Sequence, residues 1–198
     1  MARTDAAARD DAGERALDAA ERLFYTRGVH AVGMDDVRAE SGVSLKRLYR
    51  LFPSKDRLVE AYLDRRDEAW RARLTARVER GRDPLERLLA VFDHLHEWFG
   101  EPDFRGCAWI NAYGELGATS AGVARRARDH KTAFRGYLRA LAREAGLSDA
   151  EADGLWLLAE GAMASAGILG DPGLALRARE AAAVLTGAAR TGESGARP

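Results

Sequence analysis

Basic side chains are concentrated in one short segment of the chain, between residues 44 and 58. The segment has a single acidic residue, Asp56, whereas over the whole chain 31 Lys and Arg residues balance 31 Asp and Glu residues. The basic residues are Lys46, Arg47, Arg50, Lys55 and Arg57. Lysine and arginine can neutralise phosphates, and a guanidinium can form paired hydrogen bonds with O6 and N7 of guanine. We interpret the segment as a candidate nucleic-acid surface, although most charge runs are solvated faces.

These basic residues lie on a predicted short helix. Leu45, Leu48 and Phe52 recur at steps of three and four, as the apolar face of a helix does. Pro53 ends this helix, because the residue before a proline avoids the α region. The same period directs the basic side chains to the opposite, solvent-facing side. Ser54 can begin the next helix, whose free N–H groups favour a phosphate.

Another short helix is predicted just before this one, over residues 34–40. Residues 41–44 between the two helices form a tight turn, in which Gly42 can take a positive φ and Ser44 can cap the second helix. Two short helices joined by a glycine-containing turn, the second basic outside and apolar inside, form a helix-turn-helix. The sequence therefore predicts contact with double-stranded DNA.

Helical periodicity continues through the rest of the sequence, without sustained β-alternation. We predict an all-α fold of about nine helices. The expected divisions are a flexible N-terminal tail (1–11), the helix-turn-helix domain (12–60), a second helical domain (61–190) and a flexible C-terminal tail (191–198). A long helix over residues 54–80 is expected to join the two domains.

The composition argues against a secreted, disulfide-linked protein and against a membrane protein. Cys107 is the single cysteine, which excludes an internal disulfide and suits a reducing compartment such as the cytoplasm. The N-terminal residues lack the apolar run of a signal peptide. The longest apolar stretch, 155–170, contains Glu160 and is shorter than the ~20 residues that a bilayer requires. We expect a buried helix there, and no membrane partner.

Patterns typical of catalysis or metal binding do not occur in the sequence. His94 and His96 are two residues apart and would face different sides of a helix, and neither HExxH nor CxxC is present. We expect no enzyme activity, no metal and no cofactor. Cys107 is expected to fill core space, because a redox sensor needs an acidified thiolate and only Arg105 is close in sequence.

Most aromatic residues lie in the second predicted domain, with a few polar residues among them. Ligand pockets have this composition, although an aromatic stripe is more often plain core. His96 is on the apolar stripe of its helix, where it is either a hydrogen-bonded core histidine or a polar group of a pocket. The candidate ligand-binding residues are Phe92, His96, Trp109, Tyr113 and Phe134.

The segment GVSLKRLYRLFPSKDRLVEAY, residues 42–62, resembles the DNA-binding domain of the TetR/AcrR family of bacterial transcriptional regulators. The matching residues are Gly28, Gly42, Val43, Ser44, Tyr49, Phe52, Lys55 and Leu58. RGCAWINAYGEL, residues 105–116, is similar to a segment at the same place in many members. The resemblance implies an all-helical homodimer that binds a palindromic operator, usually as a repressor. It also implies release when a small molecule enters the C-terminal domain.

Carried over to this chain, the resemblance implies particular contacts with DNA. Base contacts are implied for Lys46 and Arg47. Phosphate contacts are implied for Ser44, Tyr49, Arg50 and Lys55. The chain departs from the family at the start of the first motif helix, where a hydroxyl residue is usual and Gly33 stands here.

Alanines recur on the predicted helices near 155–169 and 174–189, and small residues let helices approach closely. Such packing occurs within domains, but the resemblance places a four-helix dimer interface here. The predicted function is a homodimeric repressor that a small, mostly apolar ligand releases from its DNA operator. Two alternatives remain open: a helical carrier or enzyme whose N-terminal domain is only an interaction module, and a regulator of this type without a small-molecule ligand.

Overall fold

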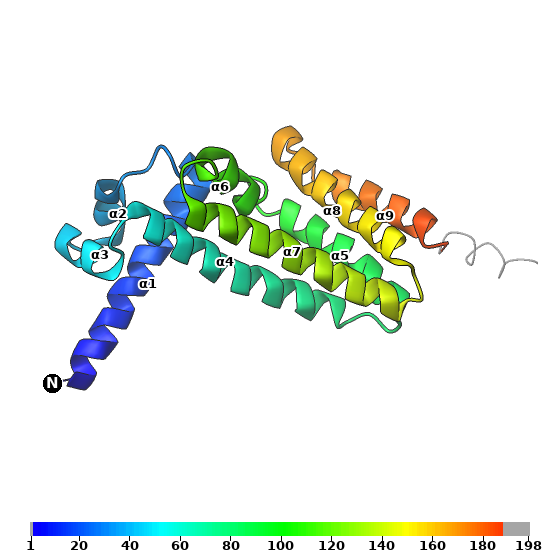
Figure 1. Cartoon of the computed structure of the whole chain (residues 1–198), viewed down its shortest axis with the longest axis horizontal. Helices are drawn as coiled ribbons and strands as arrows, with labels where there is room; N and C mark the ends of the chain where they lie inside the picture. Colours follow the sequence, from blue (N-terminus) through cyan, green and yellow to red (C-terminus); the bar gives the residue numbers. More distant parts are fainter. Residues whose placement is uncertain (1, 188–198) are drawn as a thin grey trace, which may run out of the picture. The chain divides into compact units, whose positions relative to one another are not determined.

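The computed structural model describes residues 2–187, with side chains from residue 11 onward. Within this part of the chain every regular element is an α-helix, which confirms the predicted fold class (Figure 1). The helices are α1 (Ala2–Arg27), α2 (Met34–Ser41), α3 (Leu45–Leu51), α4 (Lys55–Val78), α5 (Pro84–Phe99), α6 (Ala108–Leu116), α7 (Ala121–Glu144), α8 (Asp149–Leu169) and α9 (Gly173–Leu185). They form two compact units. The first contains the chain up to Asp67 and Ala108–Arg128, and the second contains Glu68–Cys107 and the chain from Asp129.

These two units differ from the predicted domains. Ala108–Arg128, which contains α6 and the start of α7, groups with the N-terminal helices, whereas the prediction assumed that each domain is continuous in sequence. Helix α1 begins at Ala2, so the expected tail over residues 1–11 is largely helical. The expected C-terminal tail, 191–198, lies outside the described residues.

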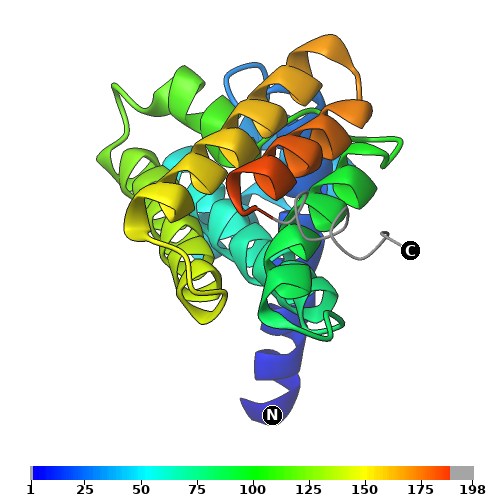
Figure 2. The same ribbon diagram turned by 90° about the vertical axis from the view of Figure 1, so that its right-hand side faces the viewer.

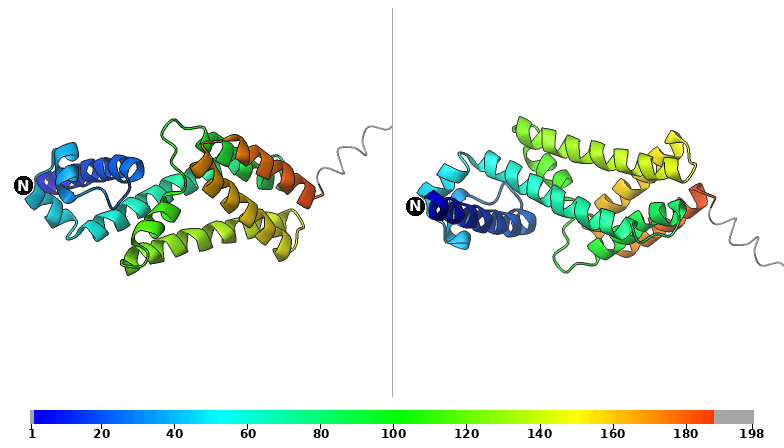
Figure 3. Two further views of the ribbon diagram at one scale, coloured as in Figure 1. Left: turned by 90° about the horizontal axis from the view of Figure 1, so that it is seen from above. Right: turned by 90° about the horizontal axis from the view of Figure 1, so that it is seen from below.

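In the first unit, α2 and α3 lie against α1 (Figure 3). Helix α1 ends where Gly28 takes a φ of 87°, in the left-handed region that favours glycine. Gly42, with a φ of 66° and a ψ of 8°, ends α2 in the same way. Leu48 on α3 is fully buried and anchors that helix. The predicted helix-turn-helix is therefore present, and its turn depends on the glycine that the sequence indicated.

Ion pairs attach α4 to α1 within the first unit. Arg65 pairs with Glu14, Asp18 and Glu21 at 3.3, 2.8 and 2.8 Å. Its neighbour Arg66 also pairs with Glu21, at 2.7 Å. Networks of this kind contribute more than isolated surface pairs, because several charges hold one geometry together. The network fixes the position of the first half of α4 relative to α1.

One carboxylate of α6 holds the loop between α1 and α2. The Val29 N–H donates to Glu115 Oε1 at 3.1 Å, and the His30 N–H donates to Glu115 Oε2 at 2.5 Å. Hydrogen bonds to a charged acceptor are among the stronger ones in proteins. A Cβ added at Gly28 would lie 3.2 Å from Oε1, so the loop and the carboxylate fit closely.

In the second unit, α8 and α9 lie side by side and both pack on α5 (Figure 2). The Glu86 N–H donates to the Asp83 side chain at 2.8 Å, which caps α5. Ser148 and Glu151 form a capping box at the start of α8. The alanines that let these helices approach are buried within the unit: Ala159, Ala162, Ala166, Ala178 and Ala182.

Trp70, on the second half of α4, is at the centre of an aromatic cluster in the second unit. Its ring lies edge-on to those of His94 and Trp98 on α5, with centroids 5.7 and 6.0 Å apart. It makes the same kind of contact with His130 and Phe134 on α7, at 5.1 and 5.2 Å. Edge-to-face geometry is the favoured one for such rings. The cluster therefore joins α4, α5 and α7.

The apolar stretch 155–170 is part of α8, and its Leu155, Ala159 and Met163 side chains are buried. The expected helix is therefore present, but it is buried on one side only, because Leu157, Ile168 and Leu169 of the same stretch are exposed. Among residues 2–187, none of the helices combines the length and the hydropathy needed to cross a membrane.

Candidate functional site

Helix α3 carries four of the six residues that are predicted to contact DNA: Lys46, Arg47, Tyr49 and Arg50. Lys46 and Arg50 are exposed, Arg47 is half-buried, and the Tyr49 side chain is 46% exposed. Leu48 points the other way and is buried. The helical period therefore separates a polar, mostly basic face from the face that anchors the helix.

Lys46 and Arg50 also differ electrostatically from the arginines around them. Within residues 11–187, neither of the two forms an ion pair with a carboxylate. The neighbouring paired arginines are Arg27 (with Asp36), Arg38 (with Asp35) and Arg57 (with Glu60). Charge that is not neutralised within the chain raises the local potential and attracts phosphates. The exposed face of α3 is therefore the part of this motif best able to hold a nucleic-acid backbone.

Ser44 and Lys55 flank α3 at the starts of two helices. Ser44 is at the N-cap position of α3, but its hydroxyl makes no capping hydrogen bond and is exposed. Lys55 is the first residue of α4, and its Nζ donates to the His30 carbonyl at 3.5 Å, a long and weak hydrogen bond. Both side chains can therefore reach a phosphate without breaking a strong interaction.

The start of α2 offers no such group. Gly33 precedes Met34 and has no side chain to cap the helix or to contact DNA. Its N–H donates instead to Asp36 Oδ2 at 2.8 Å. This hydrogen bond, and then the charge of Arg27, hold the pKa of Asp36 below its usual value. A carboxylate lies beside this helix end, so it is less suited to a phosphate than the starts of α3 and α4 are.

The five residues predicted to bind a ligand do not form one cluster. Phe92 is fully buried in α5, and His96 is half-buried, with its Nδ1 3.0 Å from the Pro172 carbonyl oxygen. Trp109 is buried in α6, whereas Tyr113 on the same helix is 55% exposed. Phe134 is the one residue of the five that lines the cavity between α4 and α7.

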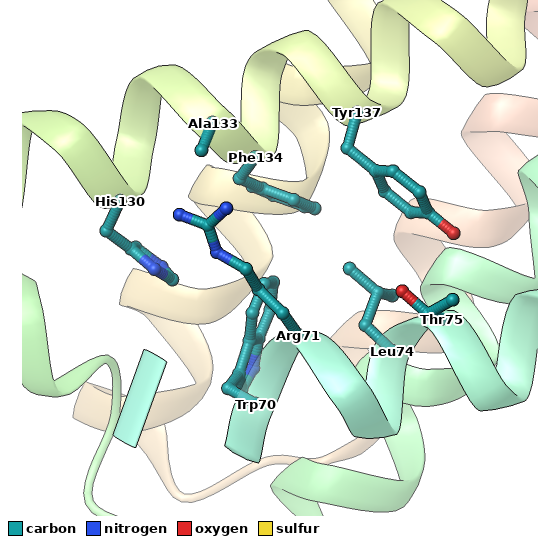
Figure 4. A pocket seen from close by; sticks show the side chains of 8 residues that line it. All are labelled: Trp70, Arg71, Leu74, Thr75, His130, Ala133, Phe134 and Tyr137. Atoms are coloured by element: carbon teal, nitrogen blue, oxygen red, sulfur yellow. The ribbon is translucent and has the colours of Figure 1, made fainter. Parts of the chain in front are cut away.

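This cavity has a volume of about 210 Å³ and belongs to the second unit (Figure 4). Its lining residues are Trp70, Arg71, Leu74, Thr75, His130, Ala133, Phe134 and Tyr137. Apart from Phe134, sequence analysis did not select them. The spacing did hold a signal, because 70 and 74 on one helix, and 130, 134 and 137 on another, recur at helical steps.

A basic residue that sequence analysis missed contacts the single cysteine. Cys107 is buried, and Lys131 Nζ donates to its Sγ at 3.3 Å and to Glu160 Oε2 at 2.5 Å. Lys131 is 24 residues away in sequence, so only the fold brings these side chains together. In the part of the chain that the structure describes, no group of three His, Cys, Asp or Glu side chains is placed to hold a metal ion.

Helices α8 and α9 present a second, apolar surface to solvent. The exposed apolar residues on these helices are Leu157, Ile168, Leu169, Leu176, Val184 and Leu185. Ile168 is the most exposed of these side chains, at 83%. The alanines expected at a dimer interface are instead buried inside the unit.

Comparison with known proteins agrees with this arrangement. A family model described as bacterial regulatory proteins of the tetR family matches residues 16–62, which contain the helix-turn-helix. A second, described as a tetracyclin repressor-like C-terminal domain, matches residues 84–182. The crystal structure of a TetR-family transcriptional regulator from Streptomyces coelicolor is 34% identical, has a TM-score of 0.83, and covers 89% of this chain and 95% of that chain.

Two curated relatives match over shorter stretches. An uncharacterised HTH-type transcriptional regulator of Mycobacterium tuberculosis is 38% identical over 78 residues, which is 39% of each protein. The HTH-type transcriptional activator FasR of Mycolicibacterium smegmatis is 34% identical over 98 residues, 50% of this chain and 44% of FasR. The chain thus matches less than half the length of either one. Because the family models match residues 16–62 and 84–182, and a 34% identical structure matches along nearly the whole chain, the protein is a member of the TetR family of bacterial transcriptional regulators.

Proposed function

We propose that this TetR-family regulator is a homodimeric repressor that binds a palindromic operator in the cytoplasm and leaves it when a small molecule binds. The observation that carries the DNA-binding assignment is the exposed pair Lys46 and Arg50, which form no ion pair among the described side chains. Lys46 and Arg47 are assigned to base edges. The phosphate contacts are assigned to Ser44, Tyr49, Arg50 and Lys55.

The exposed aliphatic residues of α8 and α9 support the dimer. A monomer would leave Leu157, Ile168 and Val184 in water, and their burial against a second copy is favourable. A dimer with two-fold symmetry can place two recognition helices about 34 Å apart, one turn of DNA. Replacing Ile168 with Glu should give monomers in sedimentation without unfolding, because this side chain is 83% exposed. If Ile168→Glu remains a dimer, the interface lies on another surface.

Ligand release is supported by the continuity of α4. The helix begins at Lys55, beside the proposed phosphate contacts, and also carries Trp70 and Leu74, which line the cavity. A ligand can shift the equilibrium between two conformations of this helix only by the difference between its affinities for them. A change of a few ångströms in the separation of two recognition helices would prevent both from docking at once.

Three other functions predict different results. FasR is named as an activator, so regulation in the opposite direction is a real alternative for this chain. A helical carrier would bind a small molecule but would show no salt-dependent affinity for DNA. A regulator without a small-molecule effector would bind its operator under all ligand conditions.

The experiment that separates these functions starts from binding selection on random DNA with the purified protein. The selected site should be a palindrome, and affinity should fall steeply with salt. Lys46→Gln and Arg50→Gln should each weaken binding, whereas Arg82→Gln, at an exposed arginine of the second unit, serves as the matched control. A reporter behind the selected site then distinguishes repression from activation. If all three variants bind DNA equally well, α3 is not the interface.

A further inference from the structure

We propose that the cavity between α4 and α7 takes a small aromatic acid, with its carboxylate at the Arg71 end and a hydroxyl at the Tyr137 end. The inference deepens the proposed function, because it names the chemical class of the effector at that site. The cavity itself is a feature of the second unit and does not depend on DNA binding.

The middle of the cavity is apolar. Trp70, Leu74 and Phe134 are buried, and the Trp70 and Phe134 rings are held almost perpendicular, at 87°. A flat ring can lie against one of these rings and meet the other edge-on, which is the favoured geometry for aromatic groups. An aliphatic chain would fill such a slot less completely than a ring does.

The volume limits the ligand to about one ring. A cavity of about 150 Å³ in another protein accommodates benzene, so about 210 Å³ leaves room for one ring and two small substituents. Ligand pockets more often measure 300–1,000 Å³. A polycyclic compound would therefore extend beyond this cavity.

The two ends of the cavity carry different polar groups (Figure 4). At one end, the Arg71 guanidinium lies near His130. Arginine has five N–H donors in a planar fork, so Arg71 can keep its existing interaction within the chain and also bind a carboxylate. The permanent charge of Arg71 makes this the end that favours an anion.

At the other end, the hydroxyl groups of Thr75 and Tyr137 point toward each other (Figure 4). Burial raises the pKa of Tyr137, and the charges of Glu79 and Glu144 raise it further. The phenol is thus neutral near pH 7 and can donate or accept one hydrogen bond. The same acidic residues disfavour a carboxylate here, which orients the ligand with its acid toward Arg71 and its hydroxyl toward Tyr137.

The test measures the binding of three small phenols of similar size to the full-length protein by calorimetry. These are 4-hydroxybenzoate, its neutral methyl ester and the cation 4-hydroxybenzylamine. We expect the acid to bind about tenfold more tightly than the ester or the amine, because only the acid pairs with a guanidinium. Arg71→Gln should remove this preference by weakening the acid alone, and Arg82→Gln should leave all three affinities unchanged.

The hydroxyl end is tested with a second comparison. Tyr137→Phe should lower the affinity for 4-hydroxybenzoate a few-fold, because the ligand hydroxyl loses its hydrogen-bond partner. The affinity for benzoate should not change, because benzoate has no hydroxyl group. Equal loss for both acids would show that the variant only disturbs packing, and it would overturn the proposed orientation. Circular dichroism of each variant checks that the helices are intact.

The possible results separate this inference from the proposed function. If the ester or the amine binds as tightly as the acid, or if Arg71→Gln has no effect, the acid assignment is wrong. If none of the probes binds to protein that still binds its operator, the inference fails and the DNA-binding function stands. If the acid binds through Arg71 but does not release DNA, the inference holds and ligand release by this cavity is excluded.

Discussion

The surface of α3 and the second unit use basic side chains in opposite ways. On α3, Lys46 and Arg50 are exposed and form no ion pair among residues 11–187. In the second unit, Arg77 pairs with Asp93 at 3.0 Å and with Glu97 at 2.9 Å. The contrast shows why residue type alone does not identify a binding surface. A cation paired within the chain supports the fold, and one without a carboxylate partner is available for a phosphate.

Two arginines that pair with Asp153 are the clearest example of basic side chains that support the fold. Arg135 and Arg139 both donate to the Asp153 carboxylate, at distances of 2.5–2.9 Å. These hydrogen bonds hold the pKa of Asp153 well below its usual range. Two arginines one helical turn apart thus form a basic run in the sequence, as on α3, but they connect α7 to α8.

The largest effect is expected from breaking a part-buried pair in the second unit. Lys131→Met removes the ammonium that pairs with Glu160 at 2.5 Å, and the other carboxylate oxygen, Oε1, has no hydrogen-bond partner in the described part of the chain. Leaving a buried charge unpaired typically costs about 3–5 kcal/mol. Chemical denaturation should therefore show a free energy of unfolding lowered by about that amount.

The matched control is the double variant Lys131→Met with Glu160→Gln. It removes both charges, so most of the lost stability should return. A double variant as unstable as Lys131→Met would mean that lysine packing, rather than the unpaired carboxylate, sets the cost.

The next effect concerns a buried histidine of the second unit. Burial, and then the charge of Arg73, lower the pKa of His94 from 6.5 to about 4. The unfolded chain therefore binds a proton between these pH values and the folded chain does not, so stability falls as the pH drops through this range. A shift of this size corresponds to about 3 kcal/mol.

The measurement compares free energies of unfolding from pH 7 down to pH 4 for the wild type and for His94→Gln. All other titrating groups are shared, so the difference between the two curves isolates His94. Parallel curves would show that His94 is protonated alike in the folded and unfolded states.

Local features of the fold were predictable from the sequence because they depend on neighbouring residues. The turn at Gly42, the buried Leu48 and the stop at Pro53 all follow from backbone preferences and helical spacing. The exposed side of α3 follows from the same period. The sequence was therefore sufficient to place the residues proposed to contact DNA on one surface.

Contacts between distant segments were not predictable in this way. Glu115 holds the Val29 amide across 86 residues, and Lys131 reaches Cys107 across 24 residues. A hydrophobic period shows which face of a helix is buried but not which helix covers it. For this reason the sequence suggests pocket candidates among the aromatic residues of the second domain but does not locate the cavity between α4 and α7.

A smaller effect is expected on α3, in DNA binding rather than in stability. Arg47→Ala should lose a paired contact with one base, at a cost of about 1–3 kcal/mol on the operator. Affinity for random DNA should change less, so the sequence preference should relax at one position of each half-site. Fluorescence anisotropy on the operator, on single-base variants and on random DNA measures this. Equal losses on all sequences would assign Arg47 to the phosphate backbone.

The smallest effect is expected from Lys55, and it can be compared with the effect of losing another lysine, Lys131. Lys55→Ala removes a lysine whose contact with the His30 carbonyl is long, 3.5 Å, so its loss should change the free energy of unfolding by less than about 0.5 kcal/mol. Affinity should fall alike for operator and random DNA, and the salt dependence should decrease by roughly one unit. Lys131→Met also removes a lysine, but it should lower the stability and leave the salt dependence of DNA binding unchanged. If Lys55→Ala destabilises the fold, or if Lys131→Met changes the salt dependence, ion pairing within the chain does not separate structural from DNA-binding cations.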